Sequence, residues 1–508
     1  MFRLLPAAVS TPAHRRILPA FAALATAVFT GLASFGATSH AADEVPLDTL
    51  FARAATPTSL RATLAAWGEE RATTEPEASG EAWYWIGESY YRQSQPDSAI
   101  LAWERAWARR RGGLEADALV EALFERKGAD DLDRAHTVAA ARVPLARASS
   151  EVDHANALGR LAWSLVQRSQ ADSAAKMFAR AERRLLSPTN SMRWIWQLRI
   201  AHAELAHGNV RRSLDLATPV AARNLLKDFD ALDLLADATP GGASRAAPLI
   251  RNEMRLLIEE RAGLVAAMKG SEVWFPSADG EPLSGIVIAP EGRGRARAAV
   301  AFVGTNESFD AWDSLATALR HAGVALILVE PRGTGSSRTK QFPSPESWRG
   351  FEDQLERETG REARAALRAL ALATPVDTSR FLVLAAGEMV GCAIEAARAD
   401  SRVLALMLTS PDPSPVARGR VLAELGAVRP PVFIEVVSTD LNLYFMNVAD
   451  LFLHAANESA SRSADSRHMG PGVMVFRNDP EAFPRFKRWL DETWKLPPRS
   501  ATPRKRPR

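Results

Sequence analysis

Residues 384–391 of the chain read LAAGEMVG, and this stretch decides the fold of the C-terminal half. Apolar residues precede Gly387, and a second glycine, Gly391, follows four positions later. A short apolar run predicts a buried strand, and glycine permits a sharp turn directly after it. The stretch therefore predicts a strand, a tight turn and the start of a helix, with Met389 midway between the two glycines.

The same alternation extends in both directions from this turn. Short runs rich in β-branched residues predict strands over 272–275, 284–288, 299–303, 324–329, 381–384, 403–408 and 432–437. Helical periodicity predicts helices over 247–268, 309–321, 348–372, 389–399, 441–456 and 480–494. Alternating strands and helices are typical of a doubly wound α/β fold, in which helices cover both faces of a mostly parallel sheet.

A second turn connects this pattern to a family. Residues 329–337, VEPRGTGSS, resemble the D-x-R-G-x-G-x-S turn that follows the fourth strand of α/β-hydrolases. Residues 302–306, FVGTN, lead into a helix that contains Ala311 and Trp312, and the order of elements matches the family from residue 272 to residue 494. The resemblance implies a sheet of the α/β-hydrolase type, in a domain that we place at residues 244–496.

The family carries its nucleophile on a strained turn, G-x-S-x-G, between the fifth strand and its helix. Gly387 and Gly391 match the two glycines, and Met389 stands at the nucleophile position. A thioether has no proton to lose and forms no acyl intermediate. The chain contains no intact G-x-S-x-G elsewhere. The resemblance therefore predicts a hydrolase fold without its serine.

Two other positions match the catalytic triad of the family. Asp440 follows the expected seventh strand, where the family has its acid, and His468 resembles the histidine ahead of the last helix. An alternative remains open for the histidine, because residues 473–476 are apolar enough to form the eighth strand. That assignment places Asn478 where the histidine belongs.

An oxyanion hole is expected from two backbone amides, those of Thr305 and Val390, the residue after the nucleophile position. Glu388 either lines the pocket or faces solvent, and the second alternative is favoured. Cys392, the single cysteine, is expected to be a small buried thiol, and one cysteine excludes a disulfide framework.

Three functions follow from these residues. The favoured hypothesis is a binding or scaffold protein whose hydrolase-like domain has lost turnover, with a small-molecule ligand as an option in its pocket. The second is a working hydrolase, an esterase or peptidase-like acyl hydrolase, that uses a residue outside the turn; Ser410 lacks flanking glycines and is a poor candidate. The third is direct attack by Glu388, one position from the site where some family members carry a nucleophilic aspartate. Scattered histidines and acids predict no metal and no cofactor.

The N-terminal half, residues 42–243, has helical periodicity throughout. It resembles the tetratricopeptide repeat, W-x2-L-G-x2-Y followed by A-x3-F-x2-A. One copy comprises Trp83, Ile86, Gly87, Tyr90, Ala99, Trp103 and Ala106, a second Leu158, Leu161, Ala162, Leu165, Ala174, Phe178 and Ala181, and a marginal third Ile200, Ala201, Gly208, Ser213 and Ala217. A degenerate copy fits between 107 and 150, and a generic helical bundle is the alternative.

A repeat stack of this kind implies a peptide or protein ligand on its concave face, and the alternative is that the helices only brace the second domain. The boundary between the halves is expected at residues 239–242, TPGG. No basic stripe with interleaved aromatic residues occurs, so nucleic acid is not an expected partner.

The two ends of the chain carry its basic excess. Residues 1–41 read as an export signal, with Arg15 and Arg16 before an apolar run and small residues ahead of a cut after Ala41. The protein is therefore expected to be exported, periplasmic or secreted, without a membrane span after cleavage; the alternative is an uncleaved anchor. Residues 497–508 form a basic tail that we expect to be disordered. The formal charge of +3 arises from these ends, because the rest of the chain has five more acidic than basic residues.

Overall fold

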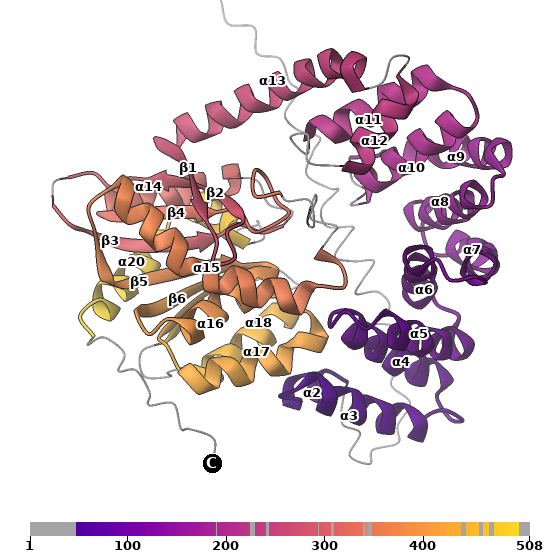
Figure 1. Cartoon of the computed structure of the whole chain (residues 1–508). Helices are drawn as coiled ribbons and strands as arrows, with labels where there is room; N and C mark the ends of the chain where they lie inside the picture. The colour runs from indigo at the N-terminus through magenta and orange to yellow at the C-terminus, as the bar shows by residue number, and fades with distance from the viewer. Residues whose placement is uncertain are drawn as a thin grey trace, which may run out of the picture.

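The computed structural model describes residues 47–188, 190, 192–223, 229–239, 243–292, 294–305, 309–338, 342, 348–437, 443–456, 461–466 and 472–496. The expected signal segment and basic tail lie outside these residues. Within them the chain divides into an all-helical half and a half built around one sheet (Figure 1).

The helical half consists of antiparallel helix pairs that stack into an arc around the second half (Figure 1). Its helices are α2 (Leu47–Arg53), α3 (Pro57–Glu70), α4 (Pro76–Tyr91), α5 (Pro96–Arg110), α6 (Gly113–Arg126), α7 (Asp131–Arg147), α8 (Glu151–Gln167), α9 (Ala171–Leu185), α10 (Arg193–Ala206), α11 (Val210–Arg223) and α12 (Phe229–Ala238). The long helix α13 (Ala243–Ala267) connects the arc to the sheet.

Small residues let the paired helices approach closely. A β-carbon on Gly87 of α4 would lie 2.3 Å from the Trp103 indole nitrogen of α5, so only glycine leaves room for this ring. Trp103 is fully buried, and its indole N–H donates to the carbonyl of Tyr84 at 3.1 Å. Gly159 of α8 gives similar room to the Trp196 ring of α10. Gly87 and Gly159 therefore allow close packing between helices.

The second half has one eight-stranded sheet with the order β1-β2-β4-β3-β5-β6-β7-β8. β2 pairs antiparallel with β1 and β4, and the other pairings are parallel. The strands are β1 (Gly270–Pro276), β2 (Pro282–Ile288), β3 (Ala296–Phe302), β4 (Val324–Val329), β5 (Val376–Ala386), β6 (Val403–Thr409), β7 (Val432–Val437) and β8 (Arg462–Ser466). The mostly parallel sheet expected from the alternating pattern is confirmed, and it is consistent with the α/β-hydrolase type.

Helices cover both faces of the sheet, which makes it doubly wound. One core packs under α15 (Glu352–Ala373), α16 (Val390–Ala399), α17 (Pro415–Val428) and α18 (Leu443–Ala455). The opposite core packs under α14 (Asp313–His321), α19 (Val475–Asn478) and α20 (Ala482–Thr493). Residues in β3, β4 and β6, and in β5 from 381 to 386, are almost completely buried, as continuous apolar runs in a covered parallel sheet require.

Two elements differ from the sequence-based expectation. The eighth strand is β8 at Arg462–Ser466, and residues 473–476 are helical, so the alternative that made them a strand is wrong. Helix α17 was not expected, because two arginines interrupt its apolar pattern. Arg418 and Arg420 are nevertheless buried, and Arg420 is paired with acidic residues of α15.

The turn after β4 depends on glycine and on one buried carboxylate. Gly335 has a φ of +45°, and a β-carbon there would lie 1.6 Å from a carboxylate oxygen of Glu330. Glu330 accepts the backbone N–H of Ser336 at 2.9 Å and both terminal guanidinium nitrogens of Arg261, at 2.7 and 2.9 Å. The turn is thereby attached to α13, which carries Arg261.

The two halves make direct contact through helices far apart in the sequence. Helix α17 packs against α2, and Val416 shares a buried cluster with Phe51 and Leu64. At the closest approach, a β-carbon on Gly419 would lie 2.2 Å from the carbonyl oxygen of Ala54. Glycine at position 419 therefore sets how near the arc approaches the sheet domain.

Among the described residues, none of the helices has both the length and the apolar character of a membrane-crossing segment.

We predict that Gly419→Ala lowers the free energy of unfolding by about 1–3 kcal/mol, because the added methyl group overlaps backbone that cannot retreat. Amide exchange in α2 should accelerate at the same time. Gly426→Ala on the same helix is the matched control, since its β-carbon would meet only an ordinary contact at 3.7 Å. Equal effects of the two substitutions in urea denaturation would contradict the close approach at Gly419.

Candidate functional site

The turn between β5 and α16 has its unusual backbone at Gly387. Ala386 ends β5 in an extended conformation, Gly387 has a φ of +52°, and a single 3-10 turn at Gly387–Met389 leads into the helix. Met389 has ordinary helical angles, with φ −76° and ψ 0°. In the hydrolase motif the nucleophile itself occupies the strained position. Here the strain falls two residues earlier, on a residue without a side chain.

Met389 and Val390 are part of the hydrophobic core. Both side chains are 0% exposed and belong to the cluster under α15 and α16. A fully buried methionine presents no atom to a substrate, and its contribution at this position is packing. The expected buried character of the single cysteine is confirmed in the same cluster, and burial raises the pKa of the Cys392 thiol.

The carboxylate of Glu388 contacts the Thr305 amide that we expected to form half of an oxyanion hole. Oxygen Oε1 of Glu388 accepts the Thr305 backbone N–H at 3.1 Å and the Thr305 hydroxyl at 2.8 Å. The contact joins the ends of neighbouring strands, since Phe302 of β3 is paired with Ala385 of β5. Glu388 is exposed, as expected, yet its head group is bound rather than free.

A buried ion cluster lies behind the second motif glycine. A β-carbon on Gly391 would lie 2.8 Å from a carboxylate oxygen of Glu356 on α15. Glu356 accepts from Arg92 of the helical half at 2.9 Å and from Arg420 of α17 at 2.5 Å. Arg92 also donates to Asp353 at 3.0 Å. Arg92 of the arc is thus bonded to two carboxylates of α15, and one of them, Glu356, packs against the start of α16.

Ser410, at the end of β6, has a left-handed backbone. Its φ is +43°, and Ser410 is 8% exposed. The strand register sets it beside Gly387, because Ala386 is paired with Thr409. The neighbouring loop is attached to the turn, since the Asp412 N–H donates to the Gly387 carbonyl at 3.1 Å. A serine with positive φ at a strand end is uncommon. The backbone therefore makes Ser410 a stronger candidate nucleophile than its sequence context does.

The two remaining triad-equivalent residues, Asp440 and His468, lie outside the described residues. Each follows a strand of the sheet in the sequence: β7 ends at Val437 and β8 at Ser466. Asn478 does not follow a strand, because it ends the short helix α19. The alternative that gave Asn478 the place of the histidine is therefore wrong.

Sequence reasoning missed an ionic cluster on the side of the arc that faces the sheet domain. Arg199 of α10 donates to Glu121 of α6 at 2.6 Å, and it holds the pKa of that carboxyl at about 2 although burial opposes this. Burial raises the pKa of Glu88 on α4 to about 7. The guanidinium of Arg349, from the sheet half, lies 5.3 Å from the Tyr91 ring centroid. Only the fold unites these residues, which are isolated charges in the sequence.

Within the described part of the chain, no group of three or more histidine, cysteine, aspartate or glutamate side chains is arranged to hold a metal ion.

No protein-family model matches the sequence, and no curated protein is significantly similar to it. Solved structures that it resembles include dipeptidyl peptidase 4 of Porphyromonas gingivalis (16% identity, 44% of this chain and 35% of that chain, TM-score 0.33). An esterase of Pyrococcus furiosus matches at 16% identity over 44% of this chain and 90% of its own, with a TM-score of 0.34. A predicted CIB-like hydrolase of Thermoplasma acidophilum matches at 16% identity over 45% of this chain and 100% of its own, with a TM-score of 0.35.

The chain matches 35% and 42% of the length of the first peptidases among these structures. Similarities at this level of identity and TM-score carry no information on activity. The assignment of fold rests on the strand order and direction described above.

We predict that Met389→Ala lowers the free energy of unfolding by about 2–5 kcal/mol, because it leaves a cavity in a closely packed core. Leu101→Ala, at a side chain that is 61% exposed, is the control and should change it by less than about 0.5 kcal/mol. Urea denaturation measures both. A Met389 substitution as mild as that of Leu101 would show that the methionine is not a core residue.

Proposed function

We propose that the chain is a two-part binding or scaffold protein whose α/β-hydrolase-type domain has no serine-hydrolase activity. The observation that carries the proposal is the contact between Glu388 and Thr305. Oxyanion stabilisation requires a free N–H directed at the developing charge. Here that N–H donates to a carboxylate of the chain, and a substrate oxyanion would meet a negative charge in its place.

The backbone of the turn supports the same proposal. A nucleophile elbow exposes its side chain by straining the backbone of the nucleophile residue. With the left-handed angle at Gly387 and helical angles at Met389, position 389 faces the core. A small molecule at this site would have to displace the Glu388 carboxylate from Thr305, so we expect any such ligand to be a strong, uncharged acceptor of hydrogen bonds.

For the helical half we propose a bracing role together with the peptide or protein ligand that its resemblance to tetratricopeptide repeats implies. The brace is supported by Arg92, whose guanidinium is paired with Asp353 and Glu356 of the sheet domain. Burial disfavours its charge, yet the two carboxylates raise the pKa of Arg92 above its ordinary value.

An active hydrolase is the second candidate, and Ser410 is the residue that favours it. Its positive φ resembles the strain of a nucleophile, and it lies beside the turn in the sheet register. Against it, Pro411 follows directly and no helix begins until Pro415, so no helix N-terminus points at the hydroxyl. Attack by Glu388 is less favoured still, because the hydrogen bonds from Thr305 stabilise the carboxylate that would have to react.

The activity is tested by exposing the purified mature protein to a fluorophosphonate probe and to p-nitrophenyl acetate. We predict no saturable labelling and no turnover above buffer, for the wild type and for Met389→Ser, because the introduced hydroxyl faces the core. The variant Ser410→Ala tests the alternative, an active hydrolase that uses Ser410 as its nucleophile. Labelling of the wild type that disappears in Ser410→Ala would establish the second candidate in place of the first.

We also propose that residues 1–41 direct export to the periplasm or beyond and are removed. N-terminal sequencing of the protein from the culture medium or periplasm should start at Ala42. Recovery from the membrane fraction with the first 41 residues intact would establish the anchored alternative.

A further inference from the structure

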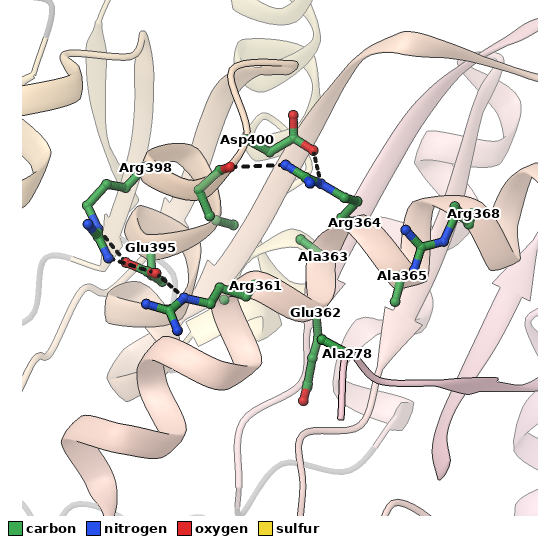
Figure 2. Close-up of a pocket in the computed structure, with 13 residues that line it drawn as sticks. Ala278, Arg361, Glu362, Ala363, Arg364, Ala365, Arg368, Glu395, Arg398 and Asp400 are labelled. Atoms are coloured by element: carbon green, nitrogen blue, oxygen red, sulfur yellow. Dashed lines mark hydrogen bonds and ion pairs between the residues drawn. The ribbon is translucent and has the colours of Figure 1, made fainter. Parts of the chain in front are cut away.

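An arginine-lined cavity lies between α15 and α16 (Figure 2). Its volume is about 520 Å³, and its lining includes four arginines, Arg361, Arg364, Arg368 and Arg398. The arginines of α15 are spaced by three and four residues, so they share one face of the helix. All four are exposed at the surface.

Two buried carboxylates hold three of these arginines in place. Glu395 is 1% exposed and accepts from Arg361 on one side, at 2.9 Å, and from Arg398 on the other (Figure 2). Asp400 accepts from Arg364 at 3.1 Å. The third acid of the lining, Glu362, is bonded by Arg332 at 2.6 Å. Cations therefore exceed the acids that remain to neutralise them, and the cavity is electropositive.

Arg368 differs from the other three arginines. It has no hydrogen bond or ion pair with any residue that the structure describes. A guanidinium carries five N–H donors in a planar fork, which matches carboxylate and phosphate oxygens. The side chain lines the cavity, and no residue in the described part of the chain uses its donors.

An apolar groove begins where the cavity ends. Residues 273–276 of β1 and Ala369, Leu372 and Ala373 of α15 line a second space of about 490 Å³. Leu372 is 89% exposed and Trp274 is 54% exposed, unusual values for large apolar side chains at neighbouring positions. Ala365 and Arg368 line both spaces, so the charged cavity and the apolar groove are continuous.

We propose that this continuous surface binds an anionic amphiphile, with its phosphate or carboxylate head at Arg364 and Arg368 and its alkyl chain along Leu372 and Trp274. The charge of the cavity selects an anion, and the adjoining groove offers apolar area to a chain that leaves water. The occupant is a single amphiphilic molecule; a phosphate without a tail would leave the groove unused.

The site is independent of the turn at Met389. The cavity is lined by residues at the end of α16, among them Glu395 and Arg398, and by Asp400 directly after the helix, whereas the turn lies at its start. A ten-residue helix spans about 15 Å. Binding here therefore neither requires nor excludes hydrolase activity, and failure of one proposal leaves the other standing.

The test is isothermal titration of the full mature chain with dodecyl phosphate below its micelle concentration. Inorganic phosphate and dodecyltrimethylammonium serve as the head alone and the same tail with the opposite charge. We expect saturable binding of dodecyl phosphate, at least tenfold weaker binding of inorganic phosphate, and no binding of the cationic amphiphile. Decyl phosphate should bind several-fold more weakly than dodecyl phosphate, because each methylene adds to the favourable free energy of transferring the alkyl chain from water into the groove.

Substitutions locate the site. Arg368→Gln should lower the affinity for dodecyl phosphate about tenfold. Arg357→Gln, on the same helix but outside the lining, should leave this affinity within twofold of the wild-type value. Leu372→Ser should weaken it several-fold, and Leu114→Ser, at a side chain that is 52% exposed in the helical half, should not. Equal binding of the anionic and cationic amphiphiles, equal binding of phosphate with and without a tail, or no effect of Arg368→Gln would each overturn the proposal.

Discussion

The carboxylate of Glu356 receives an arginine from each of two directions, and the arrangement of the molecule depends on this contact. Arg92 reaches it from the helical arc and Arg420 from α17, while Gly391 at the start of α16 lies against its oxygens. All of the ionic groups have side chains at most 11% exposed. Burying charges is costly, so such a cluster survives only when every member is paired. Removal of Arg92 leaves two buried carboxylates with one arginine between them, whereas removal of Glu356 takes a neighbour from both the arc and the turn.

This constraint connects the two halves with the chemistry of the turn. A nucleophile elbow needs a strained residue with an exposed side chain and free amides beside it. Here glycine holds the left-handed angle, methionine fills the core, and Glu388 accepts the Thr305 amide. In the function that we propose, packing from α15 on one side and a carboxylate on the other make the turn a structural joint. The binding sites that we propose then lie elsewhere, on the arc and in the arginine-lined cavity.

The sheet could be predicted from the sequence because its central strands are continuous apolar runs, a signal that needs no knowledge of partners. Strand β8, RSADS, carries no such signal and forms by pairing with β7 at the edge of the sheet. Helix α17 was missed for a related reason, since Arg420 looks like a surface residue until its partners on α15 are known. The Glu388–Thr305 contact spans 83 residues and depends on the register of β3 and β5. Local pattern predicts elements, whereas contacts between charged residues require the assembled fold.

The most direct test of this account is a double-mutant cycle between Arg92 and Glu356, with Arg92→Met, Glu356→Gln and the double variant unfolded in urea. The account predicts that each single change costs several kcal/mol and that the two are coupled by about 1–3 kcal/mol, because they remove one shared interaction. Additive effects, with a coupling energy near zero, would contradict the claim that this ion pair joins the helical arc to the turn.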